Sequence, residues 1–289
     1  MPTLLFVNWN PDPALLRIGG FELHYYSVFF ALGLVLAYLG VRKVYKDLQI
    51  PSEKLDPLFI YAFIGILIGA RLGHCLFYEP AYYLLHPVEM LLPIRETADG
   101  WRFTGYQGLA SHGGSIGLII ALWLYVRRTR LNFVDVLDFI AIVTPVAACC
   151  IRLGNLMNGE IVGKVTDVPW AFYFEGYEGA RHPAQLYEAI AYFVFAIVNA
   201  VVYLKYFRHR LLHRGFMFGM TIFMIFLFRF FIEFVKDVQV DFERGMTLNM
   251  GQWLSVPFII LGLACMIGGK WLRTLADKAE YKDRKVKKK

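Results

Sequence analysis

The densest group of side chains that could do chemistry in this sequence lies in one short stretch, RLGNLMNGEIVG, at residues 152–163. The stretch follows an apolar run and combines one cation, Arg152, with two amides, an acid and three glycines. An ionised side chain in the hydrocarbon of a bilayer costs roughly 2.5–3.5 kcal/mol on insertion scales, so such residues usually line polar cavities or pair with one another. We therefore interpret this stretch as a binding site for a lipid headgroup.

A second cation, Arg229, lies one helical turn before Glu233 in the run FRFFIEF. Residues four apart share one face of a helix, so these two side chains can form an ion pair. One interpretation is a structural pair that only orients helices. The other is a phosphate site, because the guanidinium groups of Arg152 and Arg229 can each bind phosphate oxygens with two hydrogen bonds and stay charged at physiological pH.

Two histidines and a tyrosine are further candidates. His112 precedes two glycines, and because a free imidazole titrates near pH 6.5 it is suited to accept a proton, although a helix cap is the alternative. His182 opens the polar motif HPAQLYE, whose alternative roles are helix capping and an interfacial aromatic belt. Tyr26 lies in LHYYS, where an interfacial tyrosine is also common. The histidines lack the spacing of a metal site, so we expect no metal ion.

Seven apolar windows must position these residues. The chain of 289 residues is 57% hydrophobic, with a mean hydropathy of +0.48, which is typical of a membrane protein. A spanning helix needs about 20 mostly apolar residues, and the windows lie at about 23–42, 57–77, 112–126, 133–151, 184–204, 216–235 and 251–269. We predict an all-α, polytopic integral membrane protein with about seven transmembrane helices. The third and fourth, which contain glycines and Pro145 respectively, are the candidates for short, tilted or broken helices.

The positions of lysine and arginine set the predicted orientation. Cytoplasmic loops are enriched in these residues, and here they concentrate in alternate connections, at about 42–54, 127–130, 205–214 and 270–289. We therefore place the N-terminus outside and the C-terminus in the cytoplasm. The net charge of +7 is then mostly an orientation signal, and we expect no nucleic-acid partner.

The chain reads as one membrane-embedded domain, 1–269, followed by a basic cytoplasmic tail, 270–289. Neither a fixed repeat nor a low-complexity linker divides it. Two long external segments, about 78–111 and 152–183, are rich in Tyr, Trp, Pro and Gly, and loops of this length are often functional. The start of the chain lacks the pattern of a cleavable signal peptide. The four cysteines lack disulfide or zinc spacing, so we interpret them as packing residues.

Taken in order along the chain, these motifs resemble those of one family, the bacterial prolipoprotein diacylglyceryl transferases. The RLGNxxNGE block is the most specific of them, and the set extends over most of the chain. The matching motifs are HYY at 24–26, ARLG at 70–73, HGG at 112–114, RLGNLMNGE at 152–160 with Gly163, RHPAQLYE at 181–188, FRFFIEF at 228–234 and MGQWLSVP at 250–257.

The resemblance implies transfer of a diacylglyceryl group from phosphatidylglycerol to the lipobox cysteine in the signal peptide of a prolipoprotein, giving a thioether and glycerol phosphate. His112 then becomes the candidate general base, because a thiol with a pKa near 8.5 attacks poorly until it is deprotonated. Arg152 and Arg229 become the groups that stabilise the leaving phosphate. Glu233 orients Arg229, and the other residues implied in shaping the polar cavity or in holding headgroup or peptide are Tyr26, Asn155, Asn158, Glu160, Gly163 and His182.

The same resemblance implies where the protein is located and that its reaction needs no cofactor. The protein is expected in the bacterial cytoplasmic (inner) membrane as a multi-pass protein, with its active site toward the outer face. No cofactor is expected, because the phospholipid already carries its phosphate-linked leaving group. Five residues depart from the family pattern, which has Gly, Tyr, Gly, Tyr and often Arg, respectively, at the positions of Ser27, His74, Ile151, Ile225 and Lys236.

Two other classes of protein were open on the residues alone. A secondary transporter or channel for a small polar or anionic solute also carries polar residues within its helices. Such proteins commonly show internal repeats or paired interrupted helices, and neither is clear in this sequence. An intramembrane protease would need a catalytic serine, a pair of acids or a metal pair, and none of these patterns is evident.

Overall fold

The computed structural model describes residues 7–19, 21–92, 94–97, 100–103, 108–237 and 247–269. The predicted basic tail, 270–289, lies outside these residues. The fold is mostly helical, and it divides into two compact units, one made of residues 1–48 and 137–289 and the other of residues 49–136. The prediction of a single domain over 1–269 stays a prediction.

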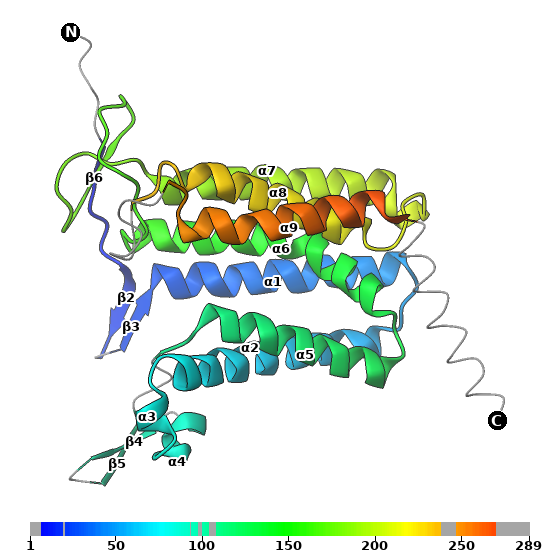
Figure 1. Ribbon diagram of the computed structural model, residues 1–289, viewed down its shortest axis with the longest axis horizontal. Coiled ribbons are helices and arrows are strands. Elements are labelled where there is room, and N and C mark those ends of the chain that lie inside the picture. The colour runs from blue at the N-terminus through cyan, green and yellow to red at the C-terminus, as the bar shows by residue number, and fades with distance from the viewer. Residues whose placement is uncertain are drawn as a thin grey trace. The chain divides into compact units, whose positions relative to one another are not determined.

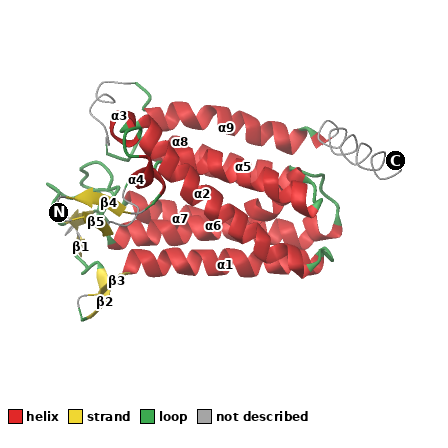
Figure 2. Ribbon diagram, turned by 90° about the horizontal axis from the view of Figure 1, so that it is seen from below, coloured by secondary structure: helices red, strands yellow, loops and turns green. Residues whose placement is uncertain are grey.

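The larger unit is built from long helices that run along a common direction (Figures 1 and 2). They are α1 (Tyr25–Asp47), α6 (Phe133–Met157, whose first turn belongs to the other unit), α7 (Ala184–Lys205), α8 (Phe216–Ile232) and α9 (Met250–Ile267), with a short 3-10 turn, η2 (Phe207–His209). Pro145 lies inside α6, and the helix continues through it. Of the three possibilities expected for this helix, namely short, tilted or broken, a break is absent.

Buried polar side chains connect these helices. Asn199 of α7 donates to the carbonyl of Ala141 on α6 (2.9 Å) and to the hydroxyl of Thr221 on α8 (2.8 Å). Asp138 of α6 accepts from the main-chain N–H groups of Gly215 (2.7 Å) and Phe218 (2.8 Å), which begin α8. Without water in a bilayer, such groups must find partners inside the protein, so these bonds fix the helix order.

The smaller unit pairs two helices through glycine. It contains η1 (Ser52–Lys54), α2 (Leu55–Phe77), α3 (Pro80–Tyr83), α4 (Pro87–Leu91), β4 (Ile94–Thr97), β5 (Gly100–Phe103) and α5 (Ser111–Thr129). A Cβ on Gly65 of α2 would lie 2.7 Å from the carbonyl oxygen of Gly117 on α5, and one on Gly73 would lie 2.7 Å from the Cα of Gly113. Small residues four apart thus let the two backbones touch.

Three short strand pairs depart from the prediction of an all-α fold. β1 (Val7–Trp9) pairs in parallel with β6 (Phe172–Phe174), β2 (Ala14–Ile18) pairs antiparallel with β3 (Phe21–His24), and β4 pairs antiparallel with β5. The longest of these strands has five residues, so helices still dominate. The β1–β6 pair joins distant parts of the chain and leaves no local sequence signal.

Each of the seven predicted windows contains a helix, but their lengths differ. Among the described residues, five helices are long and apolar enough to cross a membrane: Tyr25–Asp47, Ser52–Phe77, Phe133–Met157, Ala184–His209 and Met250–Ile267. α8 is a shorter apolar helix, and α5 is not among the five. The protein is therefore polytopic, with fewer clear spanning helices than the seven predicted.

The predicted external segments contain more regular structure than expected. α6 continues to Met157, so Arg152 and Asn155 lie on the helix and not in the loop that we placed at 152–183. The segment at 78–111 carries α3, α4, β4 and β5. The cysteines are all free; Cys75, Cys149 and Cys150 are buried, and Cys265 is half-buried.

Candidate functional site

The last turn of α6 carries a chain of polar contacts that begins at Arg152. Its Nη1 donates to Oδ1 of Asn155 (3.2 Å), and Nδ2 of Asn155 donates to Oε1 of Glu160 (2.8 Å). Asn158 donates to the same carboxylate oxygen (3.2 Å). Arg152 and Asn155 meet because residues three apart share a helix face. The structure thus brings together four of the predicted site residues.

Arg152 also contacts a residue that the sequence did not single out. Its Nε lies 3.1 Å from Oε2 of Glu188, which comes from the second turn of α7. The side chain of Glu188 is fully buried, and its oxygens accept no well-aligned hydrogen bond from the described residues. A buried carboxylate needs a compensating cation, so Glu188 is held by charge and in turn fixes Arg152.

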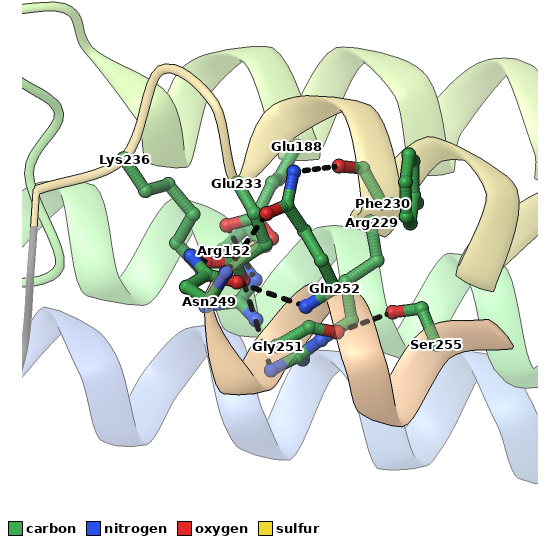
Figure 3. Close-up of polar contacts among 10 residues, drawn as sticks. All are labelled: Arg152, Glu188, Arg229, Phe230, Glu233, Lys236, Asn249, Gly251, Gln252 and Ser255. Carbon is green, nitrogen blue, oxygen red and sulfur yellow. Dashed lines mark hydrogen bonds and ion pairs between the residues drawn. The ribbon is translucent and has the colours of Figure 1, made fainter. Parts of the chain in front are cut away.

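Arg229 and Glu233 form the ion pair that their spacing predicts. Nη2 of Arg229 lies 3.8 Å from Oε1 of Glu233 (Figure 3). Glu233 has two further partners: Nδ2 of Asn249 donates to its Oε2 (2.9 Å), and Nζ of Lys236 lies 3.3 Å from its Oε1. The carboxylate of Glu233 therefore has three partners, and its contact with Arg229 is the longest of the three.

Asn249 is placed by the start of α9. It is the N-cap of this helix and forms a reciprocal capping box with Gln252, whose side chain also donates to the carbonyl of Phe230 (3.2 Å). Gly251 leaves room for Glu233, because a Cβ there would lie 2.7 Å from the carboxyl carbon of Glu233 (Figure 3). The helix start thus provides both a donor and a space for this carboxylate.

Gly163 lies at a crowded backbone junction. Its N–H donates to the carbonyl of His182 (2.9 Å), and a Cβ on it would lie 2.6 Å from the Cβ of His182 and 2.8 Å from the carbonyl oxygen of Val235. Arg181 adds a bond from Nη1 to the carbonyl of Gly163 (3.2 Å) and an ion pair with Asp237 (2.6 Å). The junction therefore holds the segment that follows α8, which carries Lys236, against the loop before α7.

His182 lies in the loop just before α7, and Tyr26 packs against the C-terminal part of α6. Nδ1 of His182 is 3.2 Å from the hydroxyl of Tyr187, which accepts a bond from Nε1 of Trp170 (2.8 Å). Burial lowers the pKa of His182, because desolvation disfavours the charged imidazolium. Tyr26, in the first turn of α1, packs against α6: a Cβ on Gly154 would lie 2.8 Å from its ring.

His112 lies in the smaller unit, in the first turn of α5, where its side chain is exposed. The glycine that follows it serves packing: a Cβ on Gly113 would clash with the carbonyl oxygen of Gly69 on α2. The close approach at this glycine is therefore one between α2 and α5.

Sequence reasoning missed the residues that hold the arginines. Glu188 was visible in HPAQLYE but received no role, Lys236 was noted only as a departure, and Asn249 was not noticed. A signal was available for Asn249, because asparagine followed by glutamine at the third helical position is a variant of the capping box. Among the described residues, no group of three or more His, Cys, Asp or Glu side chains is placed to hold a metal ion.

The comparisons with known proteins agree with the motifs. The family described as prolipoprotein diacylglyceryl transferase matches residues 13–268. Proteins named phosphatidylglycerol–prolipoprotein diacylglyceryl transferase include relatives from Bacteroides fragilis, 57% identical over 265 residues (91% of this chain and 95% of the relative), and from Tolumonas auensis, 43% identical over 261 residues (90% and 96%). A third, from Porphyromonas gingivalis, is 40% identical over 279 residues (91% and 94%). The transporter alternative finds no support among them, and the chain belongs to the prolipoprotein diacylglyceryl transferase family.

Proposed function

We propose that this protein transfers the diacylglyceryl group of phosphatidylglycerol to the lipobox cysteine of prolipoproteins. Both substrates are in the names of its relatives. The structural observation that carries the proposal is the pair of arginines, Arg152 and Arg229, each set against a carboxylate in one polar cluster between apolar helices. Such a cluster is suited to a phosphate group at the edge of a bilayer.

The reaction explains why two cations are needed. The cysteine sulfur attacks the carbon of the diacylglyceryl unit that is bonded to the phosphate oxygen. The S–C bond forms, and the C–O bond between this carbon and the phosphate oxygen breaks, with its electron pair moving to that oxygen. The phosphodiester, with one negative charge, becomes a glycerol phosphate that carries a second negative charge as it leaves. Fixed positive groups that meet this developing charge lower the barrier more than they stabilise the bound substrate.

We assign Arg152 and Arg229 to the phosphate oxygens. Glu188 and Glu233 keep them from turning away, and Asn155 and Glu160 extend the network from Arg152. We further assign Tyr26, Asn158, Gly163 and His182 to the walls that receive headgroup or peptide. Burial lowers the pKa of His182 and so favours the neutral imidazole, which would offer a hydrogen bond and no charge.

We assign His112 to the removal of the thiol proton. The assignment rests on its residue type and on the HGG motif shared with the family. A neutral imidazole can take the proton from the cysteine and pass it to solvent or to the departing phosphate. No cofactor is needed for this sequence of bonds, since the lipid supplies the leaving group.

We propose that the protein is a multi-pass protein of the bacterial inner membrane with about seven crossings, its N-terminus outside and its basic tail inside. The distribution of lysine and arginine supports this orientation. It would place the site at the outer face, where the lipid enters sideways and the signal helix of the prolipoprotein presents its cysteine at the same depth. A single transferase domain over 1–269 fits this arrangement.

The test is a transfer assay with purified protein. Phosphatidylglycerol labelled in its acyl chains is mixed with a peptide that carries a lipobox cysteine, and a Cys→Ser peptide is the control. We expect label on the cysteine peptide alone, together with released glycerol phosphate. If well-folded protein transfers no label, whichever phospholipid or lipobox peptide is supplied, the proposed function is wrong.

A further inference from the structure

We propose that Lys236 is a positioning residue whose ammonium group holds Glu188 and Glu233 together, so that each carboxylate orients one of the two arginines. The inference rests on the proposed function, because it concerns how the phosphate-binding pair is kept in place. It assigns a role to a side chain that enters the cluster from outside the helices, in the segment after α8.

Lys236 lies between the two carboxylates. Its Nζ is 3.3 Å from Oε1 of Glu233 and 3.8 Å from Oε1 of Glu188 (Figure 3). The other oxygen of Glu188 faces Nε of Arg152 at 3.1 Å, and Oε1 of Glu233 is also the partner of Arg229 at 3.8 Å. Among the described residues, the ammonium group thus links the Arg152 half of the cluster to the Arg229 half through charge.

The exposed fractions of the side chains separate the groups that can meet a substrate from those that cannot. Arg229 is 37% exposed and Arg152 16%, whereas Lys236 is 5% exposed and Glu188 is fully buried. The guanidinium groups are therefore more accessible than the ammonium group, which is almost fully enclosed. Lys236 can act on a phosphate only through the carboxylates that it holds.

Loss of the ammonium group leaves two carboxylates, the buried one of Glu188 and the largely buried one of Glu233, that repel each other. Glu188 then attracts Arg152 more strongly, and Glu233 attracts Arg229 more strongly. Both guanidinium groups therefore move away from the phosphate position. A displacement of about 1 Å at a catalytic group can cost on the order of a hundredfold in rate. The ground-state complex suffers less, because the phosphate can still pair with either arginine.

The experiment compares Lys236→Met, Lys236→Arg and a control, Lys164→Met, in the transfer assay, relative to wild-type protein that transfers label. Lys164 is an exposed lysine of the same junction, and its ammonium group donates to the carbonyl of Phe234 (3.0 Å). We expect Lys236→Met to lower kcat by about a hundredfold, with KM for phosphatidylglycerol nearly unchanged. Lys236→Arg should restore most of kcat, because it returns the charge, and Lys164→Met should behave as wild type.

A double variant, Glu188→Gln with Lys236→Met, covers the case in which Lys236→Met does not fold, because it removes one buried charge of each sign. We expect it to fold, by thermal unfolding in detergent, and to lose no more activity than the more damaging single change. Wild-type kcat in Lys236→Met, equal losses in Lys164→Met, no rescue by arginine, or losses that multiply in the double variant would each overturn the inference. An inactive wild type would instead reject the proposed function.

Discussion

At the scale of single residues, Arg152 and Arg229 differ in how firmly they are held. Arg152 lies against a fully buried carboxylate and an asparagine of its own helix, whereas Arg229 has a longer contact and a more exposed side chain. A well-fixed guanidinium is preorganised for a developing charge, and a more mobile one can follow an incoming headgroup. In the proposed phosphate site, Arg152 is therefore the more firmly fixed of the two cations.

Arg152→Lys should retain the charge and lose most of the transfer activity. Lysine cannot contact Glu188, Asn155 and a phosphate with the fixed fork of a guanidinium. We expect kcat to fall by about 10²–10³, the range for removal of one fixed donor to a developing negative charge. Arg208→Lys, at an exposed arginine of η2, is the matched control. Unchanged turnover in Arg152→Lys would remove Arg152 from the phosphate role.

His112→Gln should fold and insert but fail to activate the thiol. Without a base, the rate depends on the fraction of peptide thiolate, which rises toward a pKa near 8.5. We therefore expect the rate of the variant to climb between pH 7 and pH 9, whereas the wild-type rate climbs less. The measurement is kcat/KM for the peptide across this range. A variant with the rate and pH profile of the wild type would mean that another group is the base.

At the scale of elements, the site depends on where helices end and how closely they approach. α6 runs far enough to present Arg152 and Asn155 from one face, and the N-cap of α9 delivers Asn249 to Glu233. In the smaller unit, glycines place α5 directly against α2, which fixes the helix that begins beside His112. Backbone geometry thus sets the positions from which the reactive side chains start.

Gly69→Ala should destabilise the protein, whereas Gly114→Ala should not. A Cβ on Gly69 would clash with the carbonyl oxygen of Gly113, but one on Gly114 would meet the side chain of Ala70 at an ordinary 3.4 Å. Overpacking of this kind typically costs about 1–3 kcal/mol. Thermal unfolding in detergent should show a clearly lower Tm for Gly69→Ala alone. Equal Tm values for the two variants would contradict close backbone packing of α2 on α5.

The interactions that hold the site could be predicted only where they are local. Hydropathy predicted all seven helices, because apolar windows are continuous in sequence, and the i, i+4 spacing predicted the Arg229–Glu233 pair. Nothing local joins Arg152 to Glu188, whose contact depends on how α6 packs beside α7. The end of α6 was placed too early, because polar residues after Ile151 resemble a loop although the helix continues.

At the scale of the whole molecule, the chain combines long apolar helices with lysines and arginines concentrated in alternate connections between them. The five candidate spanning helices supply the apolar part of the molecule, and the basic connections supply its predicted orientation. In the predicted orientation, the phospholipid and the exported peptide would meet at the outer surface of the membrane, so the reaction would depend on both features.

Reporter fusions test the predicted orientation. Alkaline phosphatase, which is active only outside the cytoplasm, should be active when fused after residue 175 and inactive when fused after residue 130. A green fluorescent protein should give the opposite pattern, because it fluoresces after folding in the cytoplasm. The basic residues near 127–130 predict this result. The reverse pattern of both reporters would show that the site faces inward.

The reaction gives a reason for the burial of the protein's own cysteines. Any accessible thiol of the enzyme near the bound lipid would compete with the peptide cysteine, and it would itself become joined to the diacylglyceryl group by a stable thioether. Three of the four enzyme thiols are buried within helices, and the fourth is half-buried in α9. Burial of these thiols thus favours a sulfur delivered by another chain over the sulfurs of the enzyme itself.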